Sequence, residues 1–577
     1  MWTLLSGTWS DAPGRAVVEY VRVLLYVLLF VACAAAGRDR QDMRWAARGV
    51  ATGIAVVCVA GLVAQLAPDV LEPAPNAEPG RLGHPVTYWN AMGLLAATGL
   101  LVCTALSADL RERAPLRVLW AGLVPVLAAV LLLTFSRGAI AAGAAGAVIV
   151  VLAGRGRGLP TALLAALPPA AWAVVAAEDA ELLASATPTS AAAIAQGHDL
   201  APVIAACAAV AVLLRTALLP VDRRLAAVQV PARLRDRRTV LGGAAAVAAT
   251  GLAVALLAGA PGAFERQIDR FTAGDTVEGV GSSRLTQAGN NGRVDQWDVA
   301  LQAFADEPLR GTGAGTYALR WDLDRPQTFQ VEDAHSLYLE VLGELGVVGL
   351  VLLAAAVLLL LAGLARVARG PDRGPGAALL AGGVAWALHA GIDWDWELPA
   401  VTAWVMAAGG LCLAAAPEGG PRRLGTTARV LAGLGCLVVA LLPLRLQGSH
   451  SALQDSRDAF ARGDCRTAVD RALDAVEGLG ARAEPHVVIG VCDVRLGVPR
   501  AGVRALERAV ARDPHNWEMH YDLALVRAAA GLDPRGSLQR AARLNPREPL
   551  VTVARRHLGD DPAQWRRRAL SAPLPTE

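Results

Sequence analysis

The chain contains no lysine, so each of its 54 basic side chains is an arginine. Cysteine and histidine are scarce, with 8 and 9 residues among 577, and neither a CxxC nor an HExxH spacing occurs. Such spacings mark many zinc sites, so we predict no protein-bound metal and no cofactor. The net charge of +3 gives no reason to expect a nucleic-acid partner. The first residues lack a basic segment and a small-residue cleavage site, and we expect no signal peptide.

Long apolar runs are abundant, since 54% of the residues are hydrophobic. A helix of about 20 residues crosses a hydrocarbon core of about 30 Å, and about twelve runs of this kind occur before residue 445. They lie near 17–37, 49–67, 89–107, 117–135, 138–154, 160–177, 199–219, 239–259, 338–365, 376–392, 399–416 and 428–445. The sequence predicts an all-α, polytopic transmembrane helical bundle over residues 1–445.

The arginines define an orientation for this bundle, because they gather in alternate short loops. These clusters are Arg38/Arg40/Arg44/Arg48, Arg111/Arg113/Arg117, Arg155/Arg157, Arg223/Arg224/Arg233/Arg235/Arg237/Arg238, Arg366/Arg369/Arg373 and Arg422/Arg423/Arg429. The positive-inside rule makes all six loops cytoplasmic. A large loop at about 260–337, and the chain after residue 446, are then extracytoplasmic. The Ala-, Gly-, Arg- and Val-rich composition indicates a GC-rich bacterial genome, and hence a bacterial plasma membrane.

The C-terminal region, 446–577, differs in composition and contains a repeat. Gly463, Gly497 and Gly531 are spaced 34 residues apart, each at the end of an amphipathic segment. A 34-residue helix–turn–helix period resembles tetratricopeptide repeats, and three degenerate units cover about 451–548. Stacked repeats of this kind present a concave surface for a protein partner; the alternative is a helical cap without a partner. Cys465 and Cys492 lie in this region, where a disulfide is permitted but not required.

The outer segments contain the candidate functional residues. His335 follows two acidic residues at the boundary between the long loop and an apolar run, a position at which ionisable groups are costly and usually functional. Within the loop, Val294, Trp297, Ala300/Leu301 and Phe304 have helical spacing. The stretch GTGAGTY (311–317) follows as a glycine-rich turn, for which phosphate binding is one weak interpretation.

Four stretches together resemble a known family. They are RLGHPVTYWNAMG (81–93), LTFSRGAIAAG (133–143), the GTGAGTY turn with AHSLYLEVLGELGVVGL (334–350), and HAGIDWDWELPAV (389–401). In this order they look like the O-antigen ligase/polymerase superfamily. The resemblance implies a multi-spanning glycosyltransferase that uses polyprenyl-diphosphate-linked glycans outside the plasma membrane, without a metal. It covers most of 1–445.

The resemblance also implies roles for individual residues. His335 matches the loop histidine that acts as general base, while Arg137, Arg293 and, more loosely, Arg81 match arginines that bind the diphosphate. The family usually has Asn after the histidine, where this chain has Ser336.

Acidic and phenolic side chains are expected to support this site. Asp333, Asp393 and Asp395 are candidates to orient the imidazole, and Tyr317 belongs to the family pattern. If one helix starts at His335, its geometry places Glu344 opposite the histidine. Ser336, Glu340 and Glu344 then form one row, which we interpret as locking that helix against the bundle.

The leading hypothesis is a polymerase or ligase that joins lipid-linked oligosaccharides of a capsule, cell wall or O-antigen, with inversion at the anomeric centre. Its expected partners are the lipid-linked glycan donor, a glycan or protein acceptor and membrane lipid. A protein O-oligosaccharyltransferase is the first alternative. A lipid-linked glycan transporter or flippase, and a non-catalytic scaffold that acts through the repeats, belong to other classes of function.

Overall fold

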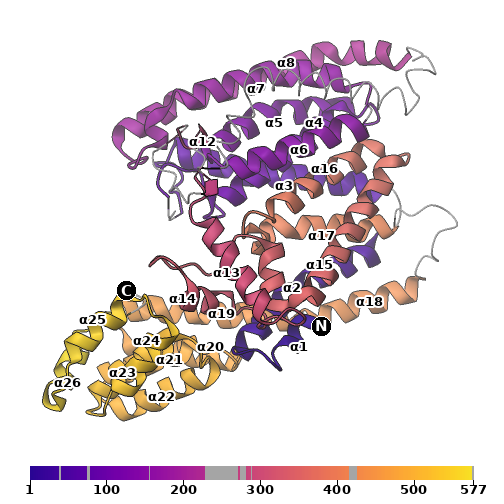
Figure 1. Cartoon of the computed structure of the whole chain (residues 1–577). Helices are drawn as coiled ribbons and strands as arrows, with labels where there is room; N and C mark the ends of the chain where they lie inside the picture. Colours follow the sequence, from indigo (N-terminus) through magenta and orange to yellow (C-terminus); the bar gives the residue numbers. More distant parts are fainter. Residues whose placement is uncertain are drawn as a thin grey trace. The chain divides into compact units, whose positions relative to one another are not determined.

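The computed structural model describes residues 1–37, 41–74, 78–154, 156–227, 269, 271–272, 281, 283–286, 289–414 and 425–574. Within these residues every regular element is a helix (Figure 1). The α-helices are α1 (Trp2–Ser6), α2 (Pro13–Ala36), α3 (Gln41–Leu66), α4 (Trp89–Ala108), α5 (Ala114–Leu133), α6 (Arg137–Gly154), α7 (Leu159–Glu178), α8 (Ala191–Ala227), α12 (Ser283–Thr286), α13 (Arg293–Asp306), α14 (Tyr317–Asp324), α15 (Leu337–Arg369), α16 (Arg373–His389), α17 (Pro399–Ala414), α18 (Thr426–Val439), α19 (Leu441–Ala461), α20 (Cys465–Gly478), α21 (Glu484–Arg495), α22 (Pro499–Arg512), α23 (Trp517–Ala529), α24 (Arg535–Leu544), α25 (Pro549–Leu558) and α26 (Pro562–Ala569). Two 3-10 helices cover Glu181–Ala184 and Asp395–Glu397.

The predicted polytopic helical fold is confirmed. Among the described residues, 8 helices are long and apolar enough to cross a membrane, and α6 and α17 are shorter apolar helices. The expected run at 376–392 corresponds to α16, with 17 residues. The run at 239–259 lies outside the described residues. Each of the other expected runs overlaps one of the membrane-length helices or the shorter helices α6 and α17.

The chain divides into two compact units. The first contains residues 1–35, 295–358 and 424–577, and is called the loop–tail unit below. The second contains 36–294 and 359–423, and is called the bundle unit. The C-terminal region therefore groups with the N-terminal helices and with the second half of the long loop. The domain boundary near 445 stays a prediction.

Helix α4 is the centre of the bundle unit, where it packs against α3, α5, α6, α7 and α16. Its most apolar 18-residue window is 89% buried. Gly93 and Gly99 allow this close packing, because a Cβ atom at either position would approach neighbouring side chains within 3 Å. The packed helix places its first turn, which begins at Trp89, firmly against the segments that carry the candidate arginines.

The C-terminal region folds as consecutive helix pairs, in which α19 packs on α20, α21 on α22 and α23 on α24 (Figure 1). Gly463, Gly497 and Gly531 follow the first helix of each pair, with φ angles of 79°, 82° and 76°. Side chains other than glycine avoid this backbone region, which explains the 34-residue spacing in physical terms. The helical pairs agree with the repeat prediction; the tetratricopeptide assignment itself stays a prediction.

Cys465 and Cys492, which are 27 positions apart in the sequence, form a disulfide between α20 and α21. Both side chains are buried in one apolar cluster of the tail. The sequence permitted this bond without requiring it. Disulfides persist mainly in oxidising compartments, so the pair is consistent with an extracytoplasmic tail.

We predict that denatured, unreduced protein exposes six alkylatable thiols, and that reduction raises the number to eight. Closing a loop of this length stabilises a fold by about 3 kcal/mol, so Cys465→Ser with Cys492→Ser lowers the melting temperature of the tail. Thiol counting by mass spectrometry checks the bond. Eight alkylated thiols without reductant contradict it.

Candidate functional site

The candidate residues are distributed between the two compact units. Arg81, Arg137, Arg293 and Asp393 belong to the bundle unit. Tyr317, Asp333, His335, Glu340 and Glu344 belong to the loop–tail unit. Each group is described within its own unit.

Arg293 is positioned by the asparagine turn that precedes α13. The Asn290 side chain is buried and accepts a hydrogen bond from the Gly292 N–H over 2.7 Å. The Asn290 carbonyl accepts from the Arg293 N–H over 3.1 Å. This local bonding is typical of Asn in turns, and it makes Arg293 the first residue of the helix.

A buried carboxylate then orients the Arg293 side chain. Asp393 Oδ2 accepts from Arg293 Nη2 and from Asn90 Nδ2, each over 2.7 Å. Asp393 Oδ1 accepts from the Tyr88 hydroxyl over 2.7 Å and from the Trp394 N–H over 2.9 Å. Burial and the Asp393 charge raise the pKa of Tyr88, so this phenol remains a donor. Asp393 is thus a positioning carboxylate for Arg293.

Arg137 and Arg81 are held by backbone carbonyl groups. Arg137 Nη2 donates to the Gly289 carbonyl over 2.9 Å, four residues before Arg293. Arg81 donates to the carbonyls of Thr134 and Phe135 at the end of α5, over 2.9 and 3.2 Å. Its guanidinium also lies 4.5 Å from the centre of the Trp89 ring. These bonds leave both arginines charged and fixed in position.

The arginines are close enough to repel one another. Burial is the main cause that lowers the pKa of Arg81 to about 9, and the positive charges of Arg284 and, less strongly, Arg293 lower it further. The charges of Arg293 and Arg284 also act on Arg137. Arg284 lies on the short helix α12, pairs with Glu78 over 3.3 Å and was not identified from the sequence. Four guanidinium groups therefore gather near the carboxylates of Glu78 and Asp393, and Arg293 also interacts with the charge of Asp395.

One donor in this cluster has no protein partner among the described residues. The Nε atom of Arg293 is buried and makes no hydrogen bond there. A buried N–H without an acceptor costs about 1–3 kcal/mol, which an incoming oxygen ligand recovers. The excess of positive charge and the orphan donor together favour an anionic ligand with several oxygens.

A histidine–aspartate pair borders the same cluster. His389 Nδ1 lies 3.1 Å from Asp395 Oδ2, and both side chains are buried. A Cβ atom on Gly138 would lie 3.2 Å from His389 Nε2, so this imidazole lies directly above the residue that follows Arg137. Burial raises the pKa of Asp395, while His389 opposes this rise. The sequence identified both residues but assigned His389 no role.

His335 occupies a strained position in the loop–tail unit. Its φ angle is 50°, a region that few residues other than glycine adopt, and such strain often marks a functional site. Its Nδ1 atom lies 3.1 Å from the Asp333 carbonyl oxygen. A carbonyl only accepts, so Nδ1 carries the proton and Nε2 is the basic nitrogen. The backbone of Asp333, and not its carboxylate, therefore sets the tautomer in this contact.

The expected row of Ser336, Glu340 and Glu344 is present and buried, on a helix that begins at Leu337. Glu340 Oε2 accepts from the Ala334 N–H over 3.0 Å and so fixes the residue before His335. The expected single helix is interrupted at Gly346, whose φ and ψ angles of 66° and −169° are not helical.

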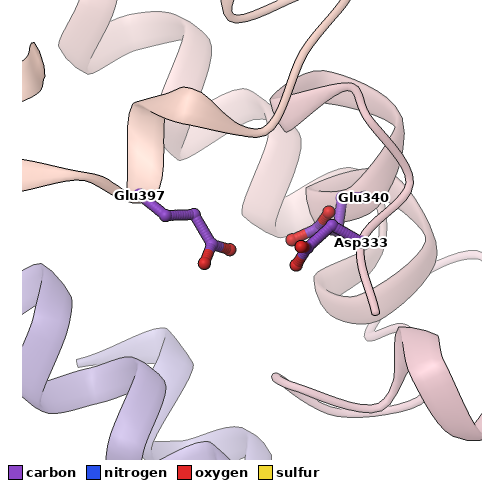
Figure 2. Close-up of side chains that lie close together, drawn as sticks. All are labelled: Asp333, Glu340 and Glu397. Carbon is purple, nitrogen blue, oxygen red and sulfur yellow. The ribbon is translucent and has the colours of Figure 1, made fainter. Parts of the chain in front are cut away.

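Asp333 and Glu340 lie side by side in Figure 2, with carboxylate oxygens within 4.8 Å of each other. Glu397, which the figure also labels, belongs to the bundle unit. Neighbouring carboxylates are common without a bound ion, and we assign no metal to this pair.

The glycine turn at 311–317 is occupied by a carboxylate of the chain itself. Glu344 Oε2 accepts from the Gly315 N–H over 2.9 Å, and Oε1 accepts from the Tyr317 N–H over 2.8 Å. The Ala314 N–H donates to Ser6 Oγ over 3.0 Å. Successive N–H groups in such turns do bind anions, but here two of them donate to the Glu344 carboxyl group. The phosphate interpretation of this turn stays untested, and the structure gives these two amides an internal acceptor.

Tyr317 supports the loop from inside. Its hydroxyl donates to the Gln296 carbonyl of α13 over 2.9 Å. Its ring packs with Val299, Trp321 and Ala334 in one buried cluster. The buried face of α13 consists of Gln296, Val299, Ala300 and Ala303. It shares Ala300 with the expected stripe, whereas Leu301 remains 43% exposed.

We predict that Glu344→Ala loosens the glycine turn, because two amides lose their acceptor at about 1–3 kcal/mol each. Glu344→Gln keeps one carbonyl acceptor and has a smaller effect. Hydrogen exchange at residues 312–317 measures the difference. Unchanged exchange in Glu344→Ala contradicts the assigned role.

A comparison with protein families agrees with this arrangement. Residues 200–354 match the model described as O-antigen ligase, a segment that includes Arg284, Arg293 and His335. No curated protein matches the chain. The match and the apolar helices support a multi-pass membrane protein that acts as a glycan ligase or polymerase in general. Within residues 200–354, the chain is similar to the O-antigen ligase family.

Proposed function

We propose that the protein is a membrane glycosyltransferase that polymerises or transfers polyprenyl-diphosphate-linked oligosaccharides on the outer face of a bacterial plasma membrane. One observation carries the donor part of this proposal. Arg81, Arg137, Arg284 and Arg293 gather in the bundle unit, and a buried donor of Arg293 has no hydrogen-bond partner in the described part of the chain.

A diphosphate fits this cluster by charge and by shape. Guanidinium groups bind phosphate oxygens through two parallel hydrogen bonds and stay charged at physiological pH. Bond cleavage transfers negative charge to the leaving diphosphate, and preformed donors stabilise that charge without reorganising. Asp393 and the Gly289 carbonyl hold Arg293 and Arg137 in advance of binding.

His335 supplies the acceptor part of the proposal. The acceptor hydroxyl transfers its proton to His335 Nε2 as its oxygen bonds to the anomeric carbon. The bond from that carbon to the diphosphate breaks, and the electron pair leaves with the phosphate. A single displacement of this kind inverts the anomeric centre. The reaction requires His335 and the arginine cluster to act on the same pair of substrates.

The nature of the acceptor separates the remaining alternatives. A sugar hydroxyl on a second lipid-linked chain gives a polymerase, a different glycan gives a ligase, and a serine or threonine gives a protein O-oligosaccharyltransferase. A flippase or transporter moves the donor without consuming it. Purified protein incubated with lipid-diphosphate glycans distinguishes these cases, since only an enzyme yields longer lipid-linked products or glycosylated protein.

We predict that His335→Ala lowers product formation by a factor of about 10²–10⁴, the usual contribution of a general base. The matched control is His198→Ala, which removes an exposed imidazole paired with Asp69 in another outer segment. Product length on gels, in protein that is inserted and folded, is the readout. Normal products from the His335 variant would eliminate its catalytic role.

We predict that Arg137→Lys loses most activity, by about ten- to a hundredfold, because an ammonium group cannot form the two-pronged contact. Arg310→Lys is the control, since Arg310 is exposed and pairs only weakly with Glu307 three residues away. Initial rates at saturating and limiting donor check the result. Near-normal rates in Arg137→Lys return this residue to a structural role.

A further inference from the structure

We propose that the C-terminal tail clamps the segment that leads to His335, and that Arg325 is the positioning residue of this clamp. The inference rests on the proposed function for its effect on catalysis. The clamp itself consists of contacts within the loop–tail unit. It gives the repeat region a role inside its own chain.

Arg325 is the central residue of the clamp. It follows α14 in the hydrophilic loop, yet only 1% of it is exposed. Its Nη2 atom donates to Asn545 Oδ1 over 2.9 Å and to Glu548 Oε2 over 3.3 Å. Asn545 ends α24, and Glu548 caps α25 by accepting from the Leu550 N–H. The guanidinium therefore joins the loop to the turn between two tail helices.

The second terminal nitrogen of the guanidinium, Nη1, closes a turn in the loop. Arg325 Nη1 donates to the carbonyls of Thr328 and Phe329 over 2.9 and 3.0 Å. The Phe329 carbonyl also accepts from Trp321 Nε1 over 3.0 Å. One side chain thus closes the 325–329 turn and fixes it to the tail.

Three further contacts reinforce the same junction. Gln330 Nε2 donates to Glu548 Oε2 over 3.0 Å. Asn545 Nδ2 donates to Asp322 Oδ1 over 3.0 Å, and Arg547 donates to the Arg325 carbonyl. The loop residues come from both sides of Arg325, so the junction holds a segment and not a single point.

Burial explains why this junction is more than a surface contact. Removing a guanidinium from water costs several kcal/mol unless charge and hydrogen bonds replace the lost hydration. Glu548 supplies the charge, and Asn545 with two loop carbonyls supplies most of the acceptors. If any of these partners moves away, the buried guanidinium loses a hydrogen bond or its balancing charge. The contact is therefore strongly coupled to the conformation of residues 325–330.

A packed path leads from the clamp to the candidate base. Trp321 is fully buried and contacts the Phe329 ring, with ring centres 5.3 Å apart. Trp321 and Ala334 belong to one buried cluster, and Ala334 immediately precedes His335. Since His335 has a strained backbone, its conformation persists only where its neighbours are held in place. Glu340 holds the preceding residue through the Ala334 amide, and the clamp holds the segment before that residue.

The test compares variants of the full-length protein in nanodiscs. Arg325→Ala removes the clamp from the loop, and Asn545→Ala weakens it from the tail. Arg320→Ala is the loop control, because Arg320 lies on α14, the helix that Arg325 follows, and pairs with Asp306 and Asp324. Asn516→Ala is the tail control, because Asn516 caps α23 at the corresponding turn of the preceding pair.

We expect hydrogen exchange at residues 326–336 to rise about ten- to a hundredfold in both clamp variants, because losing a hydrogen bond to a charged group destabilises the closed state by that factor. Both controls keep wild-type exchange in this segment. We also expect kcat to fall in the clamp variants while KM for the donor stays unchanged, because the clamp touches none of the four arginines. Arg325→Lys restores part of kcat.

Each outcome has a distinct meaning. Wild-type exchange in folded Arg325→Ala or Asn545→Ala overturns the clamp. Increased exchange with an unchanged kcat overturns the positioning role. If Arg325→Ala does not fold, Asn545→Ala gives the same decision from a site 220 residues away. Normal activity of His335→Ala overturns the proposed function separately, because the exchange measurement needs no turnover.

Discussion

The ion pair between Asp393 and Arg293 is the interaction on which the candidate donor site depends. An arginine cluster repels itself, and it remains compact only where carboxylates, carbonyls or a ligand offset that repulsion. Asp393 combines two tasks, because it balances one charge and also receives hydrogen bonds from Tyr88 and Asn90 of the buried α4 end. The rigid helix therefore fixes the carboxylate, and the carboxylate fixes the guanidinium.

In the loop–tail unit, too, polar and charged groups are held by partners from the same chain. Glu344 accepts hydrogen bonds from the glycine turn, and Glu548 balances the buried Arg325. Charges in this unit are thus used for positioning. In the bundle unit, Arg293 keeps a buried Nε atom without a hydrogen-bond partner among the described residues, next to other guanidinium groups.

The sequence predicted what depends on local pattern. Apolar length gave the spans, and the 34-residue glycine spacing gave the helix pairs, because positive φ angles require glycine there. It failed where tertiary partners decide. The buried face of α13 is set by the loop that packs on it, and the break at Gly346 depends on distant groups such as Trp2, which donates to Leu345. Arg284 and Arg325 resemble any loop arginine until their carboxylates are located.

The family match has a further physical consequence. It spans residues 200–354, which include Arg284, Arg293, Arg325 and His335. Their partners lie largely outside this segment. Glu78 and Asp393 pair with the first two arginines, and Asn545 with Glu548 surrounds the third. A buried charge without its partner is costly, so the family segment cannot keep its geometry independently of the helices before it and the tail after it. The candidate site therefore depends on partners from outside the segment that matches the family, on Glu78 and Asp393 in the bundle unit and on Asn545 and Glu548 in the loop–tail unit.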